Sequence, residues 1–223
     1  MRGKPKVGFV TIGQSPRTDI MANISPLLVG FEVLEAGALD AITDPTSLAP
    51  APGEKVLVSR LRDGTQVKLG EGKVIPLVYE AVESIIRQGA RLVVLLCTGT
   101  FPRWELPVPV LYPGPLLYHF TAALANPETK LAVFIPAPEQ EEEARKRWGK
   151  LVNDVQVISL SPYINFVDFV AGLRQTEGLA ERELIVMDCL GYGSQHKRAV
   201  RHIAPCPVLL PRTLVARVVH ELI

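Results

Sequence analysis

Two cysteines stand in matching settings within this 223-residue chain. Each follows a run of aliphatic residues and precedes a glycine by two positions, in Leu95-Leu96-Cys97-Thr98-Gly99 and in Met187-Asp188-Cys189-Leu190-Gly191. Aliphatic runs of this length predict strands buried in a parallel sheet. We therefore expect both thiols at the carboxyl ends of strands, the edge where open α/β sheets bind ligands. Helix N-termini and loop amides gather at that edge and stabilise a thiolate.

A pair of such thiols suits proton transfer at a carbon atom. Moving a proton from one face of a carbon to the other needs an acid and a base on opposite sides. The ordinary cysteine pKa of about 8.5 allows either role near neutral pH. We expect Cys97 and Cys189 to be catalytic, with amides supplied by Thr98, Gly99, Leu190 and Gly191, and we expect no cofactor. The competing interpretation is that both are core residues, because cysteine is among the most buried residue types.

The loop Gly13-Gln14-Ser15-Pro16-Arg17 follows the first predicted strand. We expect Ser15 to cap a helix and Pro16 to occupy its first position. The Arg17 guanidinium suits bidentate binding of a substrate carboxylate, to which Gln14 and Ser15 would add polar contacts. The alternative is that Arg17 is a solvated residue of the first turn and that Ser15 only caps the helix.

A second signal overlaps the first thiol. Cys97 and Arg103 have the C-x5-R spacing of cysteine-dependent phosphatases, in which loop amides and an arginine hold a phosphoryl group for attack by the thiolate. Pro102 would remove one amide from such a loop, and neither Ser nor Thr follows Arg103. We keep this interpretation as the weaker alternative.

Predicted strands and helices alternate along the chain. Aliphatic runs indicate strands at 7–12, 31–36, 91–96, 108–111, 131–135, 155–160, 183–188 and 208–210. Helices are expected from Ser15, over 74–86, after Pro115, and over 139–150, 164–177 and 212–222. Asp63-Gly64 between two short apolar runs predicts a hairpin. The alternation predicts an α/β fold whose parallel sheets carry helices on both faces.

The chain is expected to form two domains that each supply one thiol. The segment from Trp104 to Pro115 is rich in proline and lies near the middle of the chain, as a domain crossover would. We assign residues 1–112 and 208–223 to the first α/β domain and residues 113–207 to the second. The site would then lie between the two.

Composition excludes several classes of function. The 24 Lys and Arg residues balance 23 Asp and Glu residues, so no basic field favours nucleic acid. Three cysteines cannot form a disulfide framework, and no uncharged apolar run is long enough to span a bilayer. Scattered histidines suggest no metal site, and Cys206 is expected in the core. We expect a cytoplasmic protein without membrane or nucleic-acid partners.

Three motifs give the chain a family resemblance: Thr11-Ile12-Gly13-Gln14-Ser15-Pro16-Arg17, the Cys97 segment, and Met187-Asp188-Cys189-Leu190-Gly191-Tyr192. On these residues the chain resembles the AroM family, within the aspartate/glutamate racemase superfamily. The resemblance implies two pseudosymmetric Rossmann-like domains with parallel sheets and an interdomain cleft. It further implies paired cysteines that exchange protons on small amino or carboxylic acids, with Thr100 and Tyr192 beside them, and by analogy a homodimer.

The chain departs from the racemase pattern at both thiols. Racemases of the superfamily usually show Cys-Asn-Thr and Cys-Thr-His, whereas this chain has Cys97-Thr98-Gly99 and Cys189-Leu190-Gly191. An amide, a hydroxyl and an imidazole are thus replaced, and Asp188 would raise the pKa of the Cys189 thiol if its carboxylate pointed inward. Two functions stay open. One is a cofactor-independent racemase or isomerase acting on a small carboxylate compound, and the other is a non-catalytic protein that binds or senses a small anion.

Overall fold

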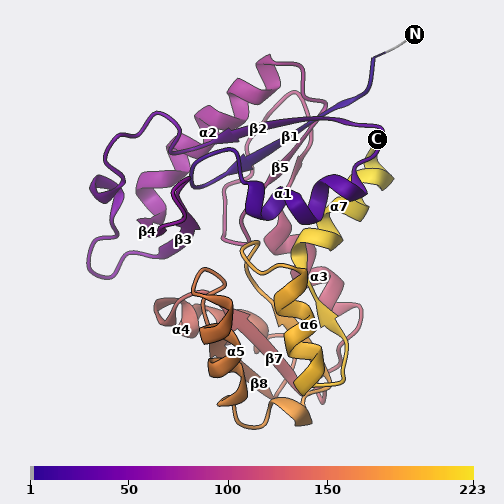
Figure 1. The fold of residues 1–223 in the computed structure, drawn as a ribbon. Helices are drawn as coiled ribbons and strands as arrows, with labels where there is room; N and C mark the ends of the chain where they lie inside the picture. The colour runs from indigo at the N-terminus through magenta and orange to yellow at the C-terminus, as the bar shows by residue number, and fades with distance from the viewer. Residues whose placement is uncertain (1–2) are drawn as a thin grey trace. The chain divides into compact units, whose positions relative to one another are not determined.

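The computed structural model describes residues 3–223 (Figure 1). The chain forms two compact units, one made of the described residues up to Gly114 together with Val215–Ile223 and the other of Pro115–Leu214. The chain passes from the first unit to the second within helix α3 (Pro113–Ala122) and returns within helix α7 (Pro211–Leu222). Each unit contains a four-stranded parallel sheet with helices, which confirms the predicted α/β class.

The sheet of the first unit has the strand order β2-β1-β5-β6. Its strands are β1 (Lys6–Thr11), β2 (Glu32–Gly37), β5 (Leu92–Leu95) and β6 (Val110–Leu111). The predicted hairpin is a separate antiparallel pair, β3 (Val56–Arg60) and β4 (Gln66–Gly70). The helices are α1 (Thr18–Ile24), α2 (Glu71–Arg87) and the short 3₁₀ turns η1 (Ser25–Leu27) and η2 (Pro45–Leu48).

Helix α2 covers one face of this sheet, packing on β1 and β2 (Figure 1). Its buried residues recur at helical spacing, with Val74, Val78, Val82 and Ile85 fully buried. The helix comes very close to β1, because a Cβ atom built on Gly8 would lie 2.0 Å from Ile85 Cγ2. This packing holds the helix together although Pro76 lies in its second turn and forgoes one backbone hydrogen bond.

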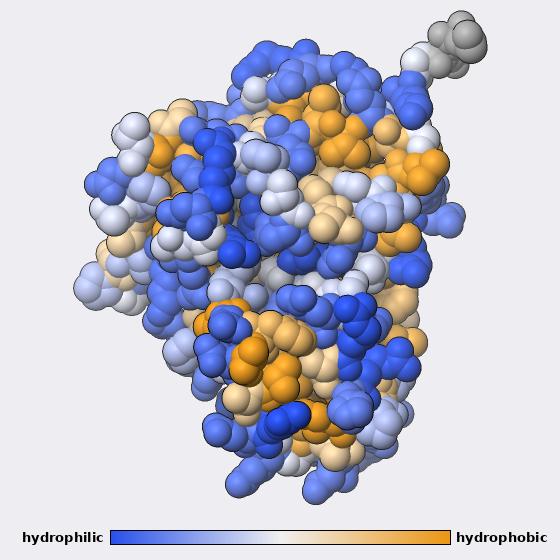
Figure 2. All heavy atoms as spheres, viewed as in Figure 1, coloured by the Kyte–Doolittle hydropathy of each residue, from blue (hydrophilic) through white to orange (hydrophobic). Residues whose placement is uncertain are grey.

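The sheet of the second unit has the order β8-β7-β9-β10. Its strands are β7 (Leu131–Ile135), β8 (Val155–Ser159), β9 (Leu184–Met187) and β10 (Val208–Leu209). Its helices are α4 (Glu141–Trp148), α5 (Phe166–Arg174) and α6 (Ser194–Ile203), with 3₁₀ turns η3 (Pro138–Gln140) and η4 (Leu179–Glu181). Figure 2 shows apolar side chains on the surface over α5, and the exposed residues of this helix include Phe166 and Val167.

The strands of the second unit are buried on both faces. In β9, Ile185 and Met187 pack with residues of α5 and α6, whereas Leu184 and Val186 pack with Trp148 of α4. Alternate residues of a strand point to opposite faces, and here both faces are covered by helices. This explains why the sequence shows a continuous aliphatic run at β9 and not an alternating one.

Three details differ from the sequence-based expectations. Helix α1 begins at Thr18, so Ser15 is not its cap, because the Ser15 N–H and hydroxyl both donate to the Asp40 carboxylate at 2.7 and 2.6 Å. Strand β6 is two residues long, shorter than the predicted 108–111. Residues 208–214 group with the second unit and not with the first, because β10 pairs with β9 in that sheet.

Candidate functional site

The first thiol lies just beyond the carboxyl end of β5. Cys97 is half-buried, and its Sγ accepts the backbone N–H of Gly99 at 3.3 Å. Gly99 packs closely here, because a Cβ on it would lie 2.8 Å from Leu57 Cδ2 of β3 and would have to displace that side chain. The sulfur and the second amide after it therefore form a tight local turn, which we call the Cys97 turn.

The second thiol has the same construction. Cys189 follows β9, is 8% exposed, and accepts the N–H of Gly191 at 3.3 Å. A Cβ on Gly191 would lie 2.6 Å from Pro162 and 2.7 Å from the Tyr163 ring, so this glycine is also closely packed. We call this the Cys189 turn. In both turns, the N–H group two residues after the cysteine points at the sulfur.

Tyr163 joins the Cys189 turn from the loop between β8 and α5. Its hydroxyl lies 3.9 Å from Cys189 Sγ, and it is half-buried. The expected contact residue Tyr192, in contrast, is fully buried, and its hydroxyl donates to the Leu160 carbonyl at 2.8 Å. Burial raises the pKa of Tyr192 well above its ordinary value, with the nearby charges of Cys189, Asp188 and Tyr163 adding to the effect.

The side chain of Asp188 lies on the other face of the sheet from Cys189. Its carboxylate accepts the Trp148 indole N–H at 2.9 Å and lies 3.5 Å from the Arg147 guanidinium. Trp148 belongs to the apolar cluster opposite the one that contains Cys189. The strand alternation thus turns Asp188 toward α4, so the inward-pointing arrangement considered from the sequence is not the one found.

The loop at residues 13–17 lies at the end of β1, and β1 pairs directly with β5, which carries Cys97. Gln14 accepts the Arg62 backbone N–H at 3.1 Å, and Arg62 also forms a 2.8 Å ion pair with Asp40. The polar groups of Ser15 bind the same Asp40 carboxylate. The hairpin loop between β3 and β4 thus fixes this loop beside the Cys97 strand.

Arg17 is buried in the first unit, with 3% of its surface exposed. Its Nε and Nη2 donate to the two carboxylate oxygens of Asp19, both at 2.8 Å, and its Nη1 contacts the Thr11 and Ser59 hydroxyls. The sequence predicts that this guanidinium binds a substrate carboxylate in a bidentate manner. The carboxylate that it binds is Asp19.

The remaining predicted contact residues differ in exposure. Thr98 and Leu190 are buried at 8% and 1% exposure, whereas Thr100 is exposed. Within each unit, then, the structure places the predicted residues at one sheet edge: loop 13–17 with 97–100 in the first unit, and 189–192 in the second.

His196 is a structural residue beside the Cys189 turn. It lies on the first turn of α6, is 4% exposed, and its Nδ1 accepts the Gly193 N–H at 2.8 Å. Its ring packs 4.6 Å from the Phe169 ring. Burial lowers the pKa of His196 to about 4, with a further contribution from the positive charge of Arg212.

Sequence reasoning missed Arg212, the second residue of α7. It is 3% exposed, and its guanidinium donates to the carbonyl oxygens of Leu190 and Gly191, the two residues that follow Cys189. In the sequence this residue is only an arginine near a helix start. Its partners are backbone carbonyls, which leave no signature in residue types.

Arg103 does not support the phosphatase alternative. Its guanidinium lies over the Tyr112 ring, 4.1 Å from the centroid. Residues 100–107 adopt no helix or strand after Cys97, so no helix N-terminus follows the thiol at the point where a phosphoryl group would need its amides.

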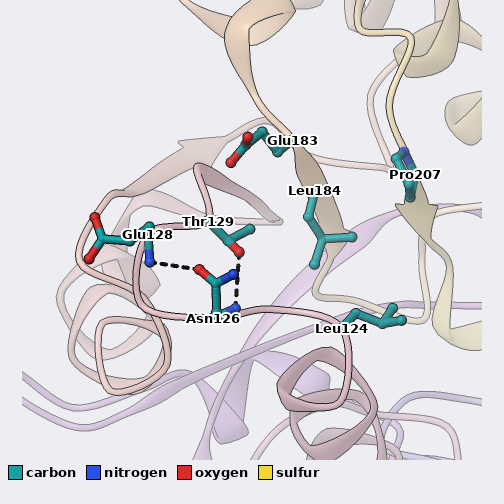
Figure 3. A pocket seen from close by; sticks show the side chains of 7 residues that line it. All are labelled: Leu124, Asn126, Glu128, Thr129, Glu183, Leu184 and Pro207. Atoms are coloured by element: carbon teal, nitrogen blue, oxygen red, sulfur yellow. Dashed lines mark hydrogen bonds between the residues drawn. The ribbon is translucent and has the colours of Figure 1, made fainter.

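A pocket of about 400 Å³ lies elsewhere in the second unit (Figure 3). Its lining includes Thr129, Glu183 and Pro207, which precede β7, β9 and β10. The pocket is therefore at the amino ends of these strands, the opposite sheet edge from Cys189. Figure 3 shows Asn126 there bonded to Glu128 and Thr129, which closes the loop before β7.

Metal-binding clusters and membrane-spanning helices are both missing from residues 3–223. No group of three or more His, Cys, Asp or Glu side chains within this range is arranged to hold a metal ion. Of the helices formed by these residues, none combines the length and apolar character needed to cross a membrane.

Comparison with known proteins identifies the family and the fold. Residues 7–223 match the family described as AroM protein, and no curated protein gives a significant match. Allantoin racemase from Pseudomonas fluorescens superposes with a TM-score of 0.65 at 14% identity, covering 97% of this chain and 90% of that one. Glutamate racemase from Thermus thermophilus in complex with beta-chloro-D-alanine gives 0.64 at 17%, covering 98% and 80%. Arylmalonate decarboxylase gives 0.54 at 14%, covering 94% and 89%. At these identities the solved structures establish the shared fold.

Proposed function

Because the chain belongs to the AroM family and has the fold of the racemases, we propose that it is a cofactor-independent racemase or isomerase. Its substrate is a small carboxylate compound, and the reaction moves a proton on a carbon beside a carbonyl group. Cys97 and Cys189 form the acid/base pair: one thiolate removes the proton while the other thiol delivers one to the opposite face.

The repeated thiol turn carries this proposal. Each sulfur accepts an amide N–H from the glycine two residues on, at the same distance of 3.3 Å. Hydrogen bonds to the ionised form of a group favour that form, so each turn supports a thiolate. A cysteine that only fills a core has no need of this arrangement, and its occurrence at corresponding strands of both sheets argues against coincidence.

The similar structures share one chemical feature. Racemisation of glutamate or allantoin passes through removal of a hydrogen from a carbon beside a carbonyl, and decarboxylation of an arylmalonate leaves a carbanion at such a carbon. Each reaction ends with protonation of that carbon. This shared step supports a carbon acid as the substrate class, with the exposed Thr100 after the first thiol as a polar contact.

In this proposal the loop Gln14–Arg17 bounds the site next to Cys97. The direct neighbourhood of β1 and β5 supports that placement. Because Arg17 already binds Asp19 and its own N–H donates to Glu35 at 2.8 Å, its contribution is to fix the backbone of this loop. Gln14 and Ser15 are half-buried in this loop.

One observation favours the alternative of a small-anion binding protein without catalysis. The residues that racemases usually carry after the two thiols, Asn-Thr and Thr-His, are here Thr98-Gly99 and Leu190-Gly191. A protein that binds an anion by loop amides alone has no requirement for reactive thiols. The two functions therefore differ in whether the cysteines are needed for turnover.

Hydrogen exchange in deuterated water tests the proposal. L-glutamate, allantoin and 2-phenylpropionate are incubated with the protein, and loss of the proton signal at the reacting carbon is followed by NMR. We expect exchange with the wild type, and at least about a 100-fold loss in Cys97→Ser and in Cys189→Ser, since a positioned acid or base contributes about 10²–10⁴-fold.

Cys206→Ser is the matched control. Cys206 is the third free cysteine, and burial raises the pKa of its thiol. We expect this variant to keep the wild-type exchange rate. Exchange that survives in both Cys97→Ser and Cys189→Ser would contradict the proposal, and calorimetric binding of a probe without any exchange would favour the anion-binding alternative.

A further inference from the structure

The buried Arg212 at the start of α7 lies where a positive charge is unfavourable in free energy. The guanidinium of Arg212 is removed from water, and a positive charge at a helix N-terminus opposes the helix dipole. Both costs must be offset by interactions that the side chain makes. Its two backbone contacts are close, and the bond from Nη2 to the Gly191 carbonyl measures 2.6 Å.

The first of these contacts acts on the same peptide group that serves Cys189. The Leu190 carbonyl accepts from Arg212 Nε, and the N–H on the other side of that peptide is the Gly191 N–H, which donates to Cys189 Sγ. In a planar trans peptide the carbonyl and the N–H point in opposite directions. Holding the carbonyl on one side therefore aims the N–H at the sulfur on the other.

The second contact fixes the next peptide group in the chain. Arg212 Nη2 binds the Gly191 carbonyl, so two successive peptide planes are held by one rigid guanidinium. A cation at the carbonyl also polarises the peptide and strengthens its N–H as a donor, as in other hydrogen-bonded chains. The hydrogen bonds thus run from the guanidinium to the peptide and from the peptide to the sulfur.

We propose that Arg212 is a positioning residue for Cys189, which orients and polarises the Leu190–Gly191 peptide so that its N–H stabilises the Cys189 thiolate. The inference rests on the proposed function for the meaning of that thiolate. It assigns the role of base in the resting protein to Cys189 and the role of acid to Cys97.

Other ionisable groups lie near the Cys189 turn. Tyr163 approaches the sulfur from the loop before α5, and Tyr192 lies behind it with its hydroxyl bonded to Leu160. Asp188 is adjacent in sequence and points to the opposite face, toward Trp148. His196 on α6 is neutral above about pH 4, because burial and Arg212 lower its pKa. Among these neighbours Arg212 supplies the positive charge.

Alkylation of Cys189 by iodoacetamide, measured from pH 5.5 to 9.5 on the full chain, tests this inference. The rate for each cysteine is read from its own peptide by mass spectrometry, so Cys97 is an internal reference. Removing the cation in Arg212→Met should raise the midpoint of the Cys189 profile by about one pH unit. At any fixed pH below the midpoint, this change corresponds to about tenfold less thiolate. The Cys97 midpoint should not move.

Two further variants complete the experiment. Arg212→Lys keeps the charge but cannot hold two carbonyls as a fork, so its Cys189 midpoint should lie between those of the wild type and Arg212→Met. Arg217→Met removes an exposed arginine from the same helix and should leave the profile unchanged. If Arg212→Met does not fold, Arg212→Lys tests the inference in its place. We then expect a raised midpoint of the Cys189 profile and a shifted Gly191 amide resonance.

A change of accessibility alone would scale the Cys189 rate at every pH and leave its midpoint in place. That result, in a folded Arg212 variant, would overturn the inference. The measurement uses no substrate, so its failure is separate from a failure of the exchange experiment with the cysteine variants.

Discussion

The two units of this protein have the same arrangement of strands and thiol turns. They differ in the residue that supports each thiol turn. Both sheets have a central strand followed by a thiol turn, and both have an edge strand followed by a proline and a helix. The edge segment is Val110-Leu111-Tyr112-Pro113-Gly114 in the first unit and Val208-Leu209-Leu210-Pro211-Arg212 in the second. The second helical residue is thus glycine in one unit and arginine in the other.

These two residues contact the same part of the thiol turn. A Cβ on Gly114 would lie 2.4 Å from the Thr98 carbonyl oxygen, whereas Arg212 donates to the corresponding Leu190 carbonyl. The first unit therefore supports its turn by close packing of backbone, and the second by a buried cation. At this matching position, therefore, only the second sulfur has a cation bound to its turn, although the local geometry of the two turns is the same.

The largest effect on folding is expected where the first unit depends on close packing. In Gly114→Ala the added methyl carbon must displace the Thr98 carbonyl, and we expect a loss of about 1–3 kcal/mol in the free energy of unfolding, as for other overpacked sites. Unfolding in urea measures it. Because the Thr98–Gly99 peptide would move, the Cys97 turn should be disturbed and the Cys189 turn should not.

Gly72→Ala is the matched control for this change. Gly72 is also the second residue of a helix, α2, and a Cβ there meets only the flexible Glu54 carboxylate at 3.3 Å. We expect no loss of stability, or a gain of up to about 1 kcal/mol from helix propensity. Equal stability of the two variants would break the proposed contrast between the units.

A pH-dependent effect is expected in the second unit, where the turn continues into α6. The pKa of His196 is about 4 in the folded protein, below its ordinary value of 6.5. Between these values the unfolded chain binds a proton that the folded one does not, so stability falls as the pH falls from 6.5 toward 4. The slope is on the order of 1 kcal/mol per pH unit.

Replacing His196 by Gln should remove this dependence. Glutamine at this helix position can still accept the Gly193 N–H, as in a capping box, and does not titrate. The difference in urea midpoint between the wild type and His196→Gln should therefore change between pH 7 and pH 4.5. A constant difference over that range would show that the pKa of His196 is not lowered in the folded protein.

Much of this arrangement could be predicted from the sequence. The strand runs that end at Cys97 and Cys189 are aliphatic because both sheet faces are buried, and the glycine two residues after each cysteine reflects close packing. These features are local, so residue types report them. The α/β class and the family followed from the same segments.

The rest depends on partners that are distant in sequence. Nothing near Arg17 shows that Ser59 of β3 also binds its guanidinium, or that Asp40 binds Ser15 in place of a helix cap. Arg212 donates to carbonyls about twenty residues away, and backbone carbonyls are the same in every residue. Strand β10 is short, so its pairing with β9 is set by the sheet and not by its own residues.

The isotope pattern of an early turnover tests the two-thiol mechanism most directly. One enantiomer of the probe that exchanges is incubated with the wild type in deuterated water, and both enantiomers are analysed at low conversion. A two-thiol mechanism leaves deuterium at the reacting carbon of the product and hydrogen at that of the remaining substrate, because the thiol that removes the proton is not the one that delivers it. Equal deuterium in both enantiomers would contradict it.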